Sequence, residues 1–513
     1  MERAEAAATM SIDSSLLRRA HALAPARSGV LIDAAAYYRA LADALDHAER
    51  FVLITGWQID TRVPLRRDPG EPCEAHSLAA VLKRACQRSP GLQIRILPWD
   101  FNPVYLIDRE WASAERFEAI APGQIECVWD SHHAPSASQH EKMVIIDGDL
   151  AFVGGIDLCD HRWDDRRHLP VDPRRCDLDG QPCGPYHDVM AVVRGPIVAD
   201  LTASFRDRWA LAADTRLDGL EPSPSPHAWP TFPNEHVIPT RQVAIVRTRG
   251  LGPEGEDIPE AGIQELLVPA LHAAERLVYV ETQYFTSRVL VDALASRFLD
   301  PNKPRMEVVF LLPARTEGVL EQAAVQGPQR AALLYLTQLA ARQGHAVGAF
   351  CPAVMPTNLS TEDPEAPPMT YVHSKLVIVD DQFLCLGSAN LTNRSMGVDS
   401  EMNLAWVADG EEQERAIGAL RTKLLSEHVG LSDDDGADVF GADGALLPVL
   451  VRLAARPDAR LVAHSFADHR ADDHTSPLED LLAEIGDPQR IETFYTRART
   501  VGQRLAAFFG DAA

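Results

Sequence analysis

Two stretches of this sequence carry the same polar residues at the same spacing: SQHEKMVIIDGDLAFVGGID at 138–157 and HSKLVIVDDQFLCLGSAN at 373–390. In each stretch a lysine lies two positions after a histidine and an aspartate lies five positions after the lysine. The residues concerned are His140, Lys142, Asp147, His373, Lys375 and Asp380. The apolar residues between lysine and aspartate, MVII and LVIV, predict a buried strand. Because side chains two apart in a strand share a face, each histidine projects together with its lysine.

A second strand with small residues follows each aspartate. Gly155 and Ser388 both lie 13 positions after their lysine, and Asp157 and Asn390 both lie 15 positions after it. Small residues allow the backbone to approach a ligand closely. Ser388 and Asn390 can also donate hydrogen bonds to a phosphoryl oxygen. These positions are therefore predicted to bind phosphate.

A carboxylate opens a later strand in each half, Asp188 in HDVMAVV and Glu401 in EMNLAWV. An imidazole that acts as a nucleophile needs an acceptor on its other ring nitrogen, which fixes the tautomer and stabilises the imidazolium. Asp188 and Glu401 are the predicted acceptors. One such set of residues could be a structural hydrogen-bond network, but two sets in register argue for a shared catalytic site.

The surrounding elements also repeat. Each half predicts the order strand, helix, strand, helix, strand, motif strand, glycine-containing strand, acidic strand and helix, which indicates a duplicated α/β unit. The predicted parts are a polar leader (1–30), a first domain (31–220), a Pro-rich linker (221–240), a second domain (241–430) and a mostly helical C-terminal extension (431–513).

The totals describe an ordinary globular chain with a strongly acidic balance. The 513 residues include 46% hydrophobic and 24% charged residues, and the formal net charge is -25. That charge repels nucleic acid, so no nucleic-acid partner is expected. Eight cysteines at irregular spacing predict reduced thiols. Cys176, Cys183 and His187 are close in sequence but lack zinc-finger spacing, so no metal is expected. The absence of a signal peptide and of a membrane span favours a cytoplasmic or peripheral membrane protein, with signal-independent export as the open alternative.

The two His-Lys-Asp sets, the GG and GS turns, and LVYVETQYF at 277–285 resemble the phospholipase D superfamily, whose signature is HxKxxxxD. The resemblance covers roughly residues 30–428. It implies two similar α/β/α-sandwich domains packed as a pseudo-dimer around one active site, with no cofactor.

The resemblance also implies roles for the motif residues. His140 is predicted to attack phosphorus and form a phosphohistidine, while His373 acts as acid and then base. Lys142, Lys375 and Asn390 would stabilise the phosphoryl oxygens. The two motif aspartates, Asp147 and Asp380, are expected to support the structure rather than contact substrate.

The substrate expected from this resemblance is a glycerophospholipid, with water or an alcohol as acceptor. A cardiolipin-synthase-like transferase, a nuclease and a non-catalytic phosphate-binding module remain the alternatives. The chain is expected to be a monomer that contacts membranes peripherally. Two roles are open for five aromatic residues: they could form a cage for a quaternary ammonium head group, or they could simply pack in the core or the pocket wall. These residues are Trp57, Trp99, Trp163, Tyr284 and Phe285.

Overall fold

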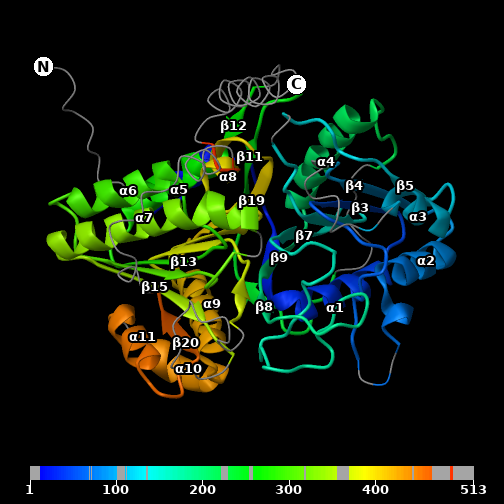
Figure 1. Cartoon of the computed structure of the whole chain (residues 1–513). Coiled ribbons are helices and arrows are strands. Elements are labelled where there is room, and N and C mark those ends of the chain that lie inside the picture. Colours follow the sequence, from blue (N-terminus) through cyan, green and yellow to red (C-terminus); the bar gives the residue numbers. More distant parts are fainter. Residues whose placement is uncertain are drawn as a thin grey trace, which may run out of the picture.

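The computed structural model describes residues 12–68, 70, 72–100, 110, 112–134, 137–220, 229–253, 258–316, 319–354, 369–441, 444–464 and 486–488. Two α/β halves lie side by side, the first at the right of Figure 1 in blue and cyan and the second at the left in green and yellow. A smaller, mostly helical part lies below the second half.

The first half is built on an eight-stranded mixed sheet. Its order is β10 (His236–Ile238), β2 (Arg27–Ile32), β9 (Val189–Arg194), β7 (Leu150–Gly154), β6 (Met143–Ile146), β3 (Phe51–Gly56), β4 (Gln93–Pro98) and β5 (Ile125–Cys127). Strands β3, β4 and β5 run parallel, whereas β6, β7, β9 and β2 pair antiparallel. The motif strand β6 therefore lies in the middle of the sheet, where its MVII side chains are buried.

The second half repeats this sheet. Its order is β1 (Ala22–Ala24), β11 (Val243–Arg249), β19 (Glu401–Val407), β18 (Phe383–Gly387), β17 (Leu376–Val379), β13 (Leu277–Glu281), β14 (Glu307–Leu311), β15 (Ala346–Pro352) and β20 (Leu461–Ala463), with β12 (Glu260–Ala261) paired to β11. The path from β11 to β15 has the same order and the same directions as the path from β2 to β5. The predicted duplicated α/β fold is confirmed.

Equivalent helices follow equivalent strands. In the first half these are α1 (Asp33–Leu45), α2 (Leu78–Arg88), α3 (Ser113–Ile120) and α4 (Ile197–Ala213). In the second half they are α5 (Gly262–Ala273), α6 (Arg288–Leu299), α7 (Val319–Gln343) and α9 (Glu411–Val429), with the short α8 (Asn393–Gly397) before β19. Short 3-10 turns span Leu16–Arg19 and Cys73–His76. Each sheet is thus covered by helices, as the apolar strand sequences require.

The two halves share one hydrophobic core. A single cluster takes side chains from both sheets, including Phe205 and Trp209 of α4 and Leu420 and Leu424 of α9. Fully burying side chains of this size contributes roughly 1.5–3 kcal/mol each. The two halves are therefore held together by apolar packing as well as by the polar contacts of the site described below.

Three short strands lie outside the two predicted domains in sequence, but each pairs with a strand of one of the two sheets. β1 lies in the predicted leader but pairs with β11 of the second half, and β10 lies in the predicted linker but pairs with β2 of the first half. β20 of the C-terminal extension pairs with β15. These exchanges cover sheet edges, which otherwise present unpaired backbone groups. The domain boundaries themselves stay a prediction.

The C-terminal extension is mostly helical where the structure describes it, with α10 (Asp433–Phe440) and α11 (Leu446–Ala454). Two further predicted helices, at 477–485 and 496–509, lie outside the described residues. In the described part of the chain no helix combines the length and apolar character needed to cross a bilayer.

Candidate active site

Two short backbone pairings bring the motifs of the halves together. β8 (Tyr186–His187) pairs in parallel with β16 (Tyr371–Val372), and Gln139 forms an equivalent parallel bridge with Ser400. The amide of His373 donates to the carbonyl of His187 at 2.8 Å. The amide of His140 likewise donates to the carbonyl of Ser400 at 2.8 Å. Each motif histidine is thereby placed beside the acidic strand of the opposite half.

The side chains cross in the same way. Nδ1 of His140 lies 2.9 Å from Oε2 of Glu401, and Nδ1 of His373 lies 2.6 Å from Oδ2 of Asp188. With Nδ1 held by a carboxylate, the second ring nitrogen, Nε2, is the atom left to react. The predicted acceptors are the two carboxylates found, and each serves the histidine of the other half.

Burial sets the protonation of these pairs. Burial, followed by the ammonium groups of Lys142 and Lys375, holds the pKa of His140 well below its usual value. Burial and then Lys375 do the same for the pKa of His373, to which His140 also contributes. Because each motif shifts the histidine of the other, the two sets form one site. Neutral imidazole is the form that can attack phosphorus.

The two carboxylates differ in proton affinity. Burial raises the pKa of Asp188 to about 6 and the pKa of Glu401 to about 8. The nearby Asp399 carboxylate contributes to the larger rise at Glu401. Glu401 therefore holds a proton to higher pH than Asp188 does.

The two lysines also have different neighbours. Nζ of Lys142 lies 3.2 Å from Oδ2 of Asp157, an ion pair inside the first half. Nζ of Lys375 instead faces the side-chain oxygen of Gln283 at 3.4 Å, and Asn390 donates to the same oxygen at 3.3 Å. Gln283, which the sequence did not single out, follows β13 in the QYF segment. Lys142 is therefore ion-paired within its own half, whereas the side-chain group that Lys375 contacts is the amide of Gln283, also in the second half.

Lys375 makes anion binding depend on pH. Burial lowers its pKa to about 7, although Asp188 opposes this shift. A folded-state pKa below the usual value means that the ammonium charge is lost as pH rises through 7. We expect the affinity for tungstate, a phosphate-like dianion, to fall from about pH 6 to about pH 8, by up to about tenfold per pH unit once the charge titrates. Isothermal titration calorimetry measures this.

A Lys375→Arg variant is the control for this prediction, because a guanidinium stays charged throughout that range. Its tungstate affinity should lose the fall centred near pH 7. A wild-type affinity that is flat across the same range would contradict the assignment of Lys375 to the anion site.

The small residues of the GG and GS turns leave space for the carboxylates of Asp188 and Glu401. A Cβ atom at Gly155 would lie 2.3 Å from Oδ1 of Asp188, so glycine is required there. At the equivalent position of the second half, Ser388 donates from Oγ to Oε2 of Glu401 at 2.5 Å. Gly155 and Ser388 therefore help to place the carboxylates that contact the histidines. Direct binding of phosphate by these two residues stays a prediction.

The motif aspartates lie at the far ends of their strands. The carboxylate of Asp147 accepts the amides of Glu49, Arg50 and Phe51 at 2.7–3.0 Å. Asp380 does the same at 2.6–2.8 Å for residues 275–277. Both aspartates have φ near +55°, and four residues of strand separate each from its lysine. They hold the start of β3 and β13, which agrees with the expected supporting role.

The five aromatic residues do not form one cage. Phe285 packs on Phe310 with ring centroids 4.7 Å apart, and the Trp163 ring is covered by the guanidinium of Arg174 at 4.9 Å. The rings that lie beside His373 are instead Tyr186, at 5.3 Å, and Tyr371, at 6.4 Å. Sequence reasoning missed both tyrosines, which pair with each other at the start of β8 and β16.

Comparison with known proteins agrees with this geometry. A family model described as phospholipase D matches residues 44–290, and a model described as cardiolipin synthase, PLD-like domain, matches residues 267–416. The chain is 26% identical to phospholipase D alpha 1 of Cynara cardunculus, over 76% of this chain and 63% of that protein. It is 25% identical to phospholipase D A of Dictyostelium discoideum, over 78% of this chain and 35% of that protein.

A solved structure, that of phosphatidylserine synthase from Haemophilus influenzae Rd KW20, has the same fold. The TM-score is 0.51 at 14% sequence identity, with 89% of this chain and 92% of that chain covered. With two such halves and two crossed His-Lys sets, the chain belongs to the phospholipase D superfamily. It spans 63% of the length of the plant relative named above, less than two thirds of it.

Proposed function

We propose that this chain is a phospholipase D-type phosphodiesterase that acts on glycerophospholipids through a covalent phosphohistidine. The observation that carries the proposal is the crossed pairing of His140 with Glu401 and of His373 with Asp188. Each imidazole has one nitrogen fixed by a carboxylate, and both lie in a site that contains Lys142 and Lys375. Two such imidazoles and two cations suffice for nucleophilic and acid–base catalysis at phosphorus.

The proposed reaction has two displacements. Nε2 of His140 attacks phosphorus, the P–O bond to the head-group alcohol breaks, and the leaving oxygen takes the Nε2 proton of His373. His373 enters this step as an imidazolium, protonated in the substrate complex, where the negative charge of the phosphodiester stabilises it. His373 then removes a proton from water, whose oxygen attacks phosphorus while the P–N bond breaks, which releases phosphatidate. An alcohol in place of water would give transfer instead of hydrolysis. The cations of Lys142 and Lys375 neutralise charge on the phosphoryl oxygens in both steps.

The order of the two histidines rests on the family resemblance and on exposure. The His140 side chain is 17% exposed and that of His373 is 7% exposed, so His140 is the more accessible ring. The higher pKa of Glu401 favours the opposite order, with His140 as the acid and His373 as the nucleophile. Mapping the covalent adduct distinguishes the two orders, and the reaction class is the same in both.

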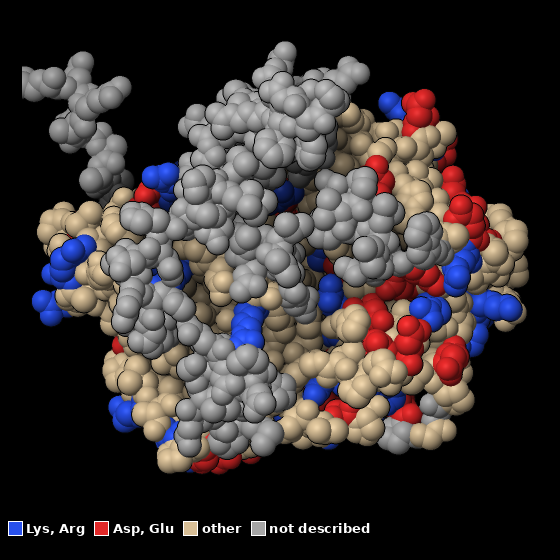
Figure 2. Space-filling view, viewed as in Figure 1, with Lys and Arg blue, Asp and Glu red and all other residues tan. Residues whose placement is uncertain are grey.

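The choice of lipid over nucleic acid rests on the relatives and on charge. The curated relatives are named phospholipase D, and the net charge of -25 opposes a polyanionic substrate. Acidic side chains gather over the first half on the face seen in Figure 2. Peripheral contact with a membrane and action as a monomer, with both motifs supplied by one chain, belong to this proposal.

A phosphatidyltransferase of the cardiolipin-synthase type is the second candidate. The match of residues 267–416 to the family model named for cardiolipin synthase favours it. Because both candidates pass through the same phosphohistidine, they differ in the acceptor and not in the first step.

A substrate panel tests the proposal. Purified full-length chain should release the head group from at least one of phosphatidylcholine, phosphatidylethanolamine and phosphatidylglycerol presented in vesicles, and added ethanol should divert part of the product to phosphatidylethanol. Formation of cardiolipin from phosphatidylglycerol as the main product would favour the transferase. Cleavage of single-stranded DNA alone, or tungstate binding without any turnover, would refute the lipid assignment.

A further inference from the structure

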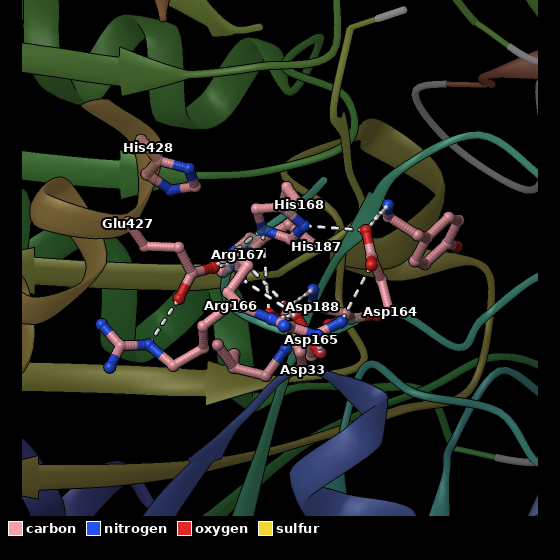
Figure 3. Close-up of polar contacts among 12 residues, drawn as sticks. Asp33, Asp164, Asp165, Arg166, Arg167, His168, His187, Asp188, Glu427 and His428 are labelled. Atoms are coloured by element: carbon pink, nitrogen blue, oxygen red, sulfur yellow. Dashed lines mark hydrogen bonds and ion pairs between the residues drawn. The ribbon is translucent and has the colours of Figure 1, made fainter. Parts of the chain in front are cut away.

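A second cluster of charged side chains is sealed between the two halves. Asp33 at the start of α1, together with His168 and His187, comes from the first half, and Glu427 comes from α9 of the second half. All four side chains are 0–1% exposed. Figure 3 shows them turned toward one another between the ribbons of the two halves. The proposed chemistry uses none of them.

One atom of each side chain points to a common place. Asp33, His168, His187 and Glu427 each offer one ligand atom, and these four atoms lie within 4.8 Å of one another. Oε1 of Glu427 is 2.6 Å from Nδ1 of His187 and 3.0 Å from Nε2 of His168, which is 3.7 Å from Oδ2 of Asp33. Tetrahedral ligands at about 2.0–2.1 Å from zinc are roughly 3.3 Å apart. Two of the three separations given above are shorter than this value and one is longer.

The remaining atoms of both imidazoles are already occupied. Nε2 of His187 lies 2.9 Å from Glu281, and Nδ1 of His168 lies 2.8 Å from Asp164. A histidine that binds metal usually donates its other ring nitrogen to a carboxylate, which fixes the tautomer. Both histidines have this arrangement, and their other ring nitrogens both face Oε1 of Glu427.

The carboxylates are oriented in the same sense. Oε2 of Glu427 accepts from Nε of Arg166 at 2.8 Å. Oδ1 of Asp33 accepts the amide of Asp188 at 3.4 Å and lies 3.2 Å from Nδ1 of His187. Oδ2 of Asp33 is fully buried and has no hydrogen-bond partner. A buried carboxylate oxygen without a donor is costly, and a cation would satisfy it.

We propose that Asp33, His168, His187 and Glu427 bind one divalent transition metal ion, with zinc as the best fit to two imidazoles and two carboxylates. Four protein ligands close the coordination shell, which is the arrangement of a structural site. The ion would tie α9 of the second half to the first half. It would also fix His187, whose neighbour Asp188 holds His373. Cys176 and Cys183, which are close to His187 in sequence, are not part of this site. The residues that bind the ion together with His187 are more distant in sequence.

Metal analysis of the untagged full-length chain tests this. Protein purified without chelator should contain about one zinc or other transition metal ion per chain. Removing it with a chelator should lower Tm by roughly 5 °C or more, and returning zinc should restore it. Cobalt bound in place of zinc should give the visible absorption of a tetrahedral centre. Metal content below a tenth of an ion per chain, together with no change of Tm on adding zinc, would overturn the proposal.

Single substitutions separate this site from adventitious binding. Asp33→Asn and His168→Gln should each remove the bound metal and the zinc-dependent shift in Tm. The control is His161→Gln, since Nδ1 of the exposed His161 lies 3.2 Å from the Cys183 thiol, where zinc could also bind. That variant should keep the metal. If His161→Gln loses it instead, the cluster is an ion-pair network without a metal. If the ligand variants do not fold, cobalt spectra and metal content of the wild-type chain still decide.

Discussion

Replacing His140 or His373 with asparagine should lower phospholipid turnover by roughly 10³- to 10⁶-fold while the chain stays folded. Asparagine removes the nucleophilic or proton-transferring nitrogen but can still hydrogen-bond to the carboxylate that each ring contacts. The Tm and the circular dichroism spectrum of both variants should therefore stay close to those of the wild type. Near-normal turnover in both variants would eliminate the proposed mechanism.

An activated substrate distinguishes the two roles. A p-nitrophenyl phosphodiester has a leaving group that needs no proton, so the variant that lacks only the acid should still release one equivalent of p-nitrophenol in a burst. We expect this burst from His373→Asn and not from His140→Asn. In His373→Asn the phosphoryl group should remain bound, and mass spectrometry of the digested protein should locate it on His140. A burst from His140→Asn with the adduct on His373 would reverse the roles.

The duplicated fold and the residues that meet in the candidate active site could be predicted from sequence because both depend on local patterns. The histidine and lysine of each motif directly precede the apolar strands β6 and β17, and the same offsets occur in both halves. Asp188 and Glu401 could be predicted as acceptors because each opens the corresponding strand of its half.

The partner of each histidine could not be predicted from sequence. Glu401 is 261 positions from His140, and Asp188 is 185 positions from His373. Which carboxylate reaches which ring depends on the packing of the two halves, and the duplicated pattern is symmetric with respect to that choice. The exchanged strands β1 and β10 escaped prediction for the same reason, since each short segment could cover either sheet edge.

The four residues of the buried cluster were not predicted as a site, because the sequence around each one has a simpler local interpretation. His168 ends a mixed-charge run, DHRWDDRRH at 160–168, which also suits a solvated loop, and Asp33 looks like an acidic residue in the first turn of a helix. In the structure Arg166 of that run instead reaches Glu427 and Asp433 of the second half. Burial of the set arises only when α9 closes over the loop, which no local pattern records.

Replacing Glu401 with glutamine should slow the first chemical step by roughly 10² to 10⁴-fold, provided that His140 is the nucleophile. Glutamine keeps the size of the side chain and can still accept from Ser388, but unlike Glu401 it cannot ionise to stabilise an imidazolium as that charge forms. Asp188→Asn is the matched variant, since Asp188 is equally buried but contacts His373.

The crossed arrangement predicts which of the two changes matters in a chain that has lost one histidine. In a His373→Asn background, the rate of the p-nitrophenol burst reports attack by His140 alone. There Glu401→Gln should reduce the burst rate by the full factor, whereas Asp188→Asn should change it by less than about threefold, because its partner imidazole is already absent. Stopped-flow absorbance measures both rates.

If the adduct maps to His373, the same comparison is made in a His140→Asn background, and Asp188→Asn should then be the damaging change. Either result supports crossed pairing, because the carboxylate that matters always comes from the half opposite to the nucleophile. A larger effect from the carboxylate of the nucleophile's own half, Asp188 with His140 or Glu401 with His373, would mean that the halves do not exchange their acids during turnover. The shared site would then be two separate half-sites, each lacking its second histidine, and the two-displacement mechanism would fail.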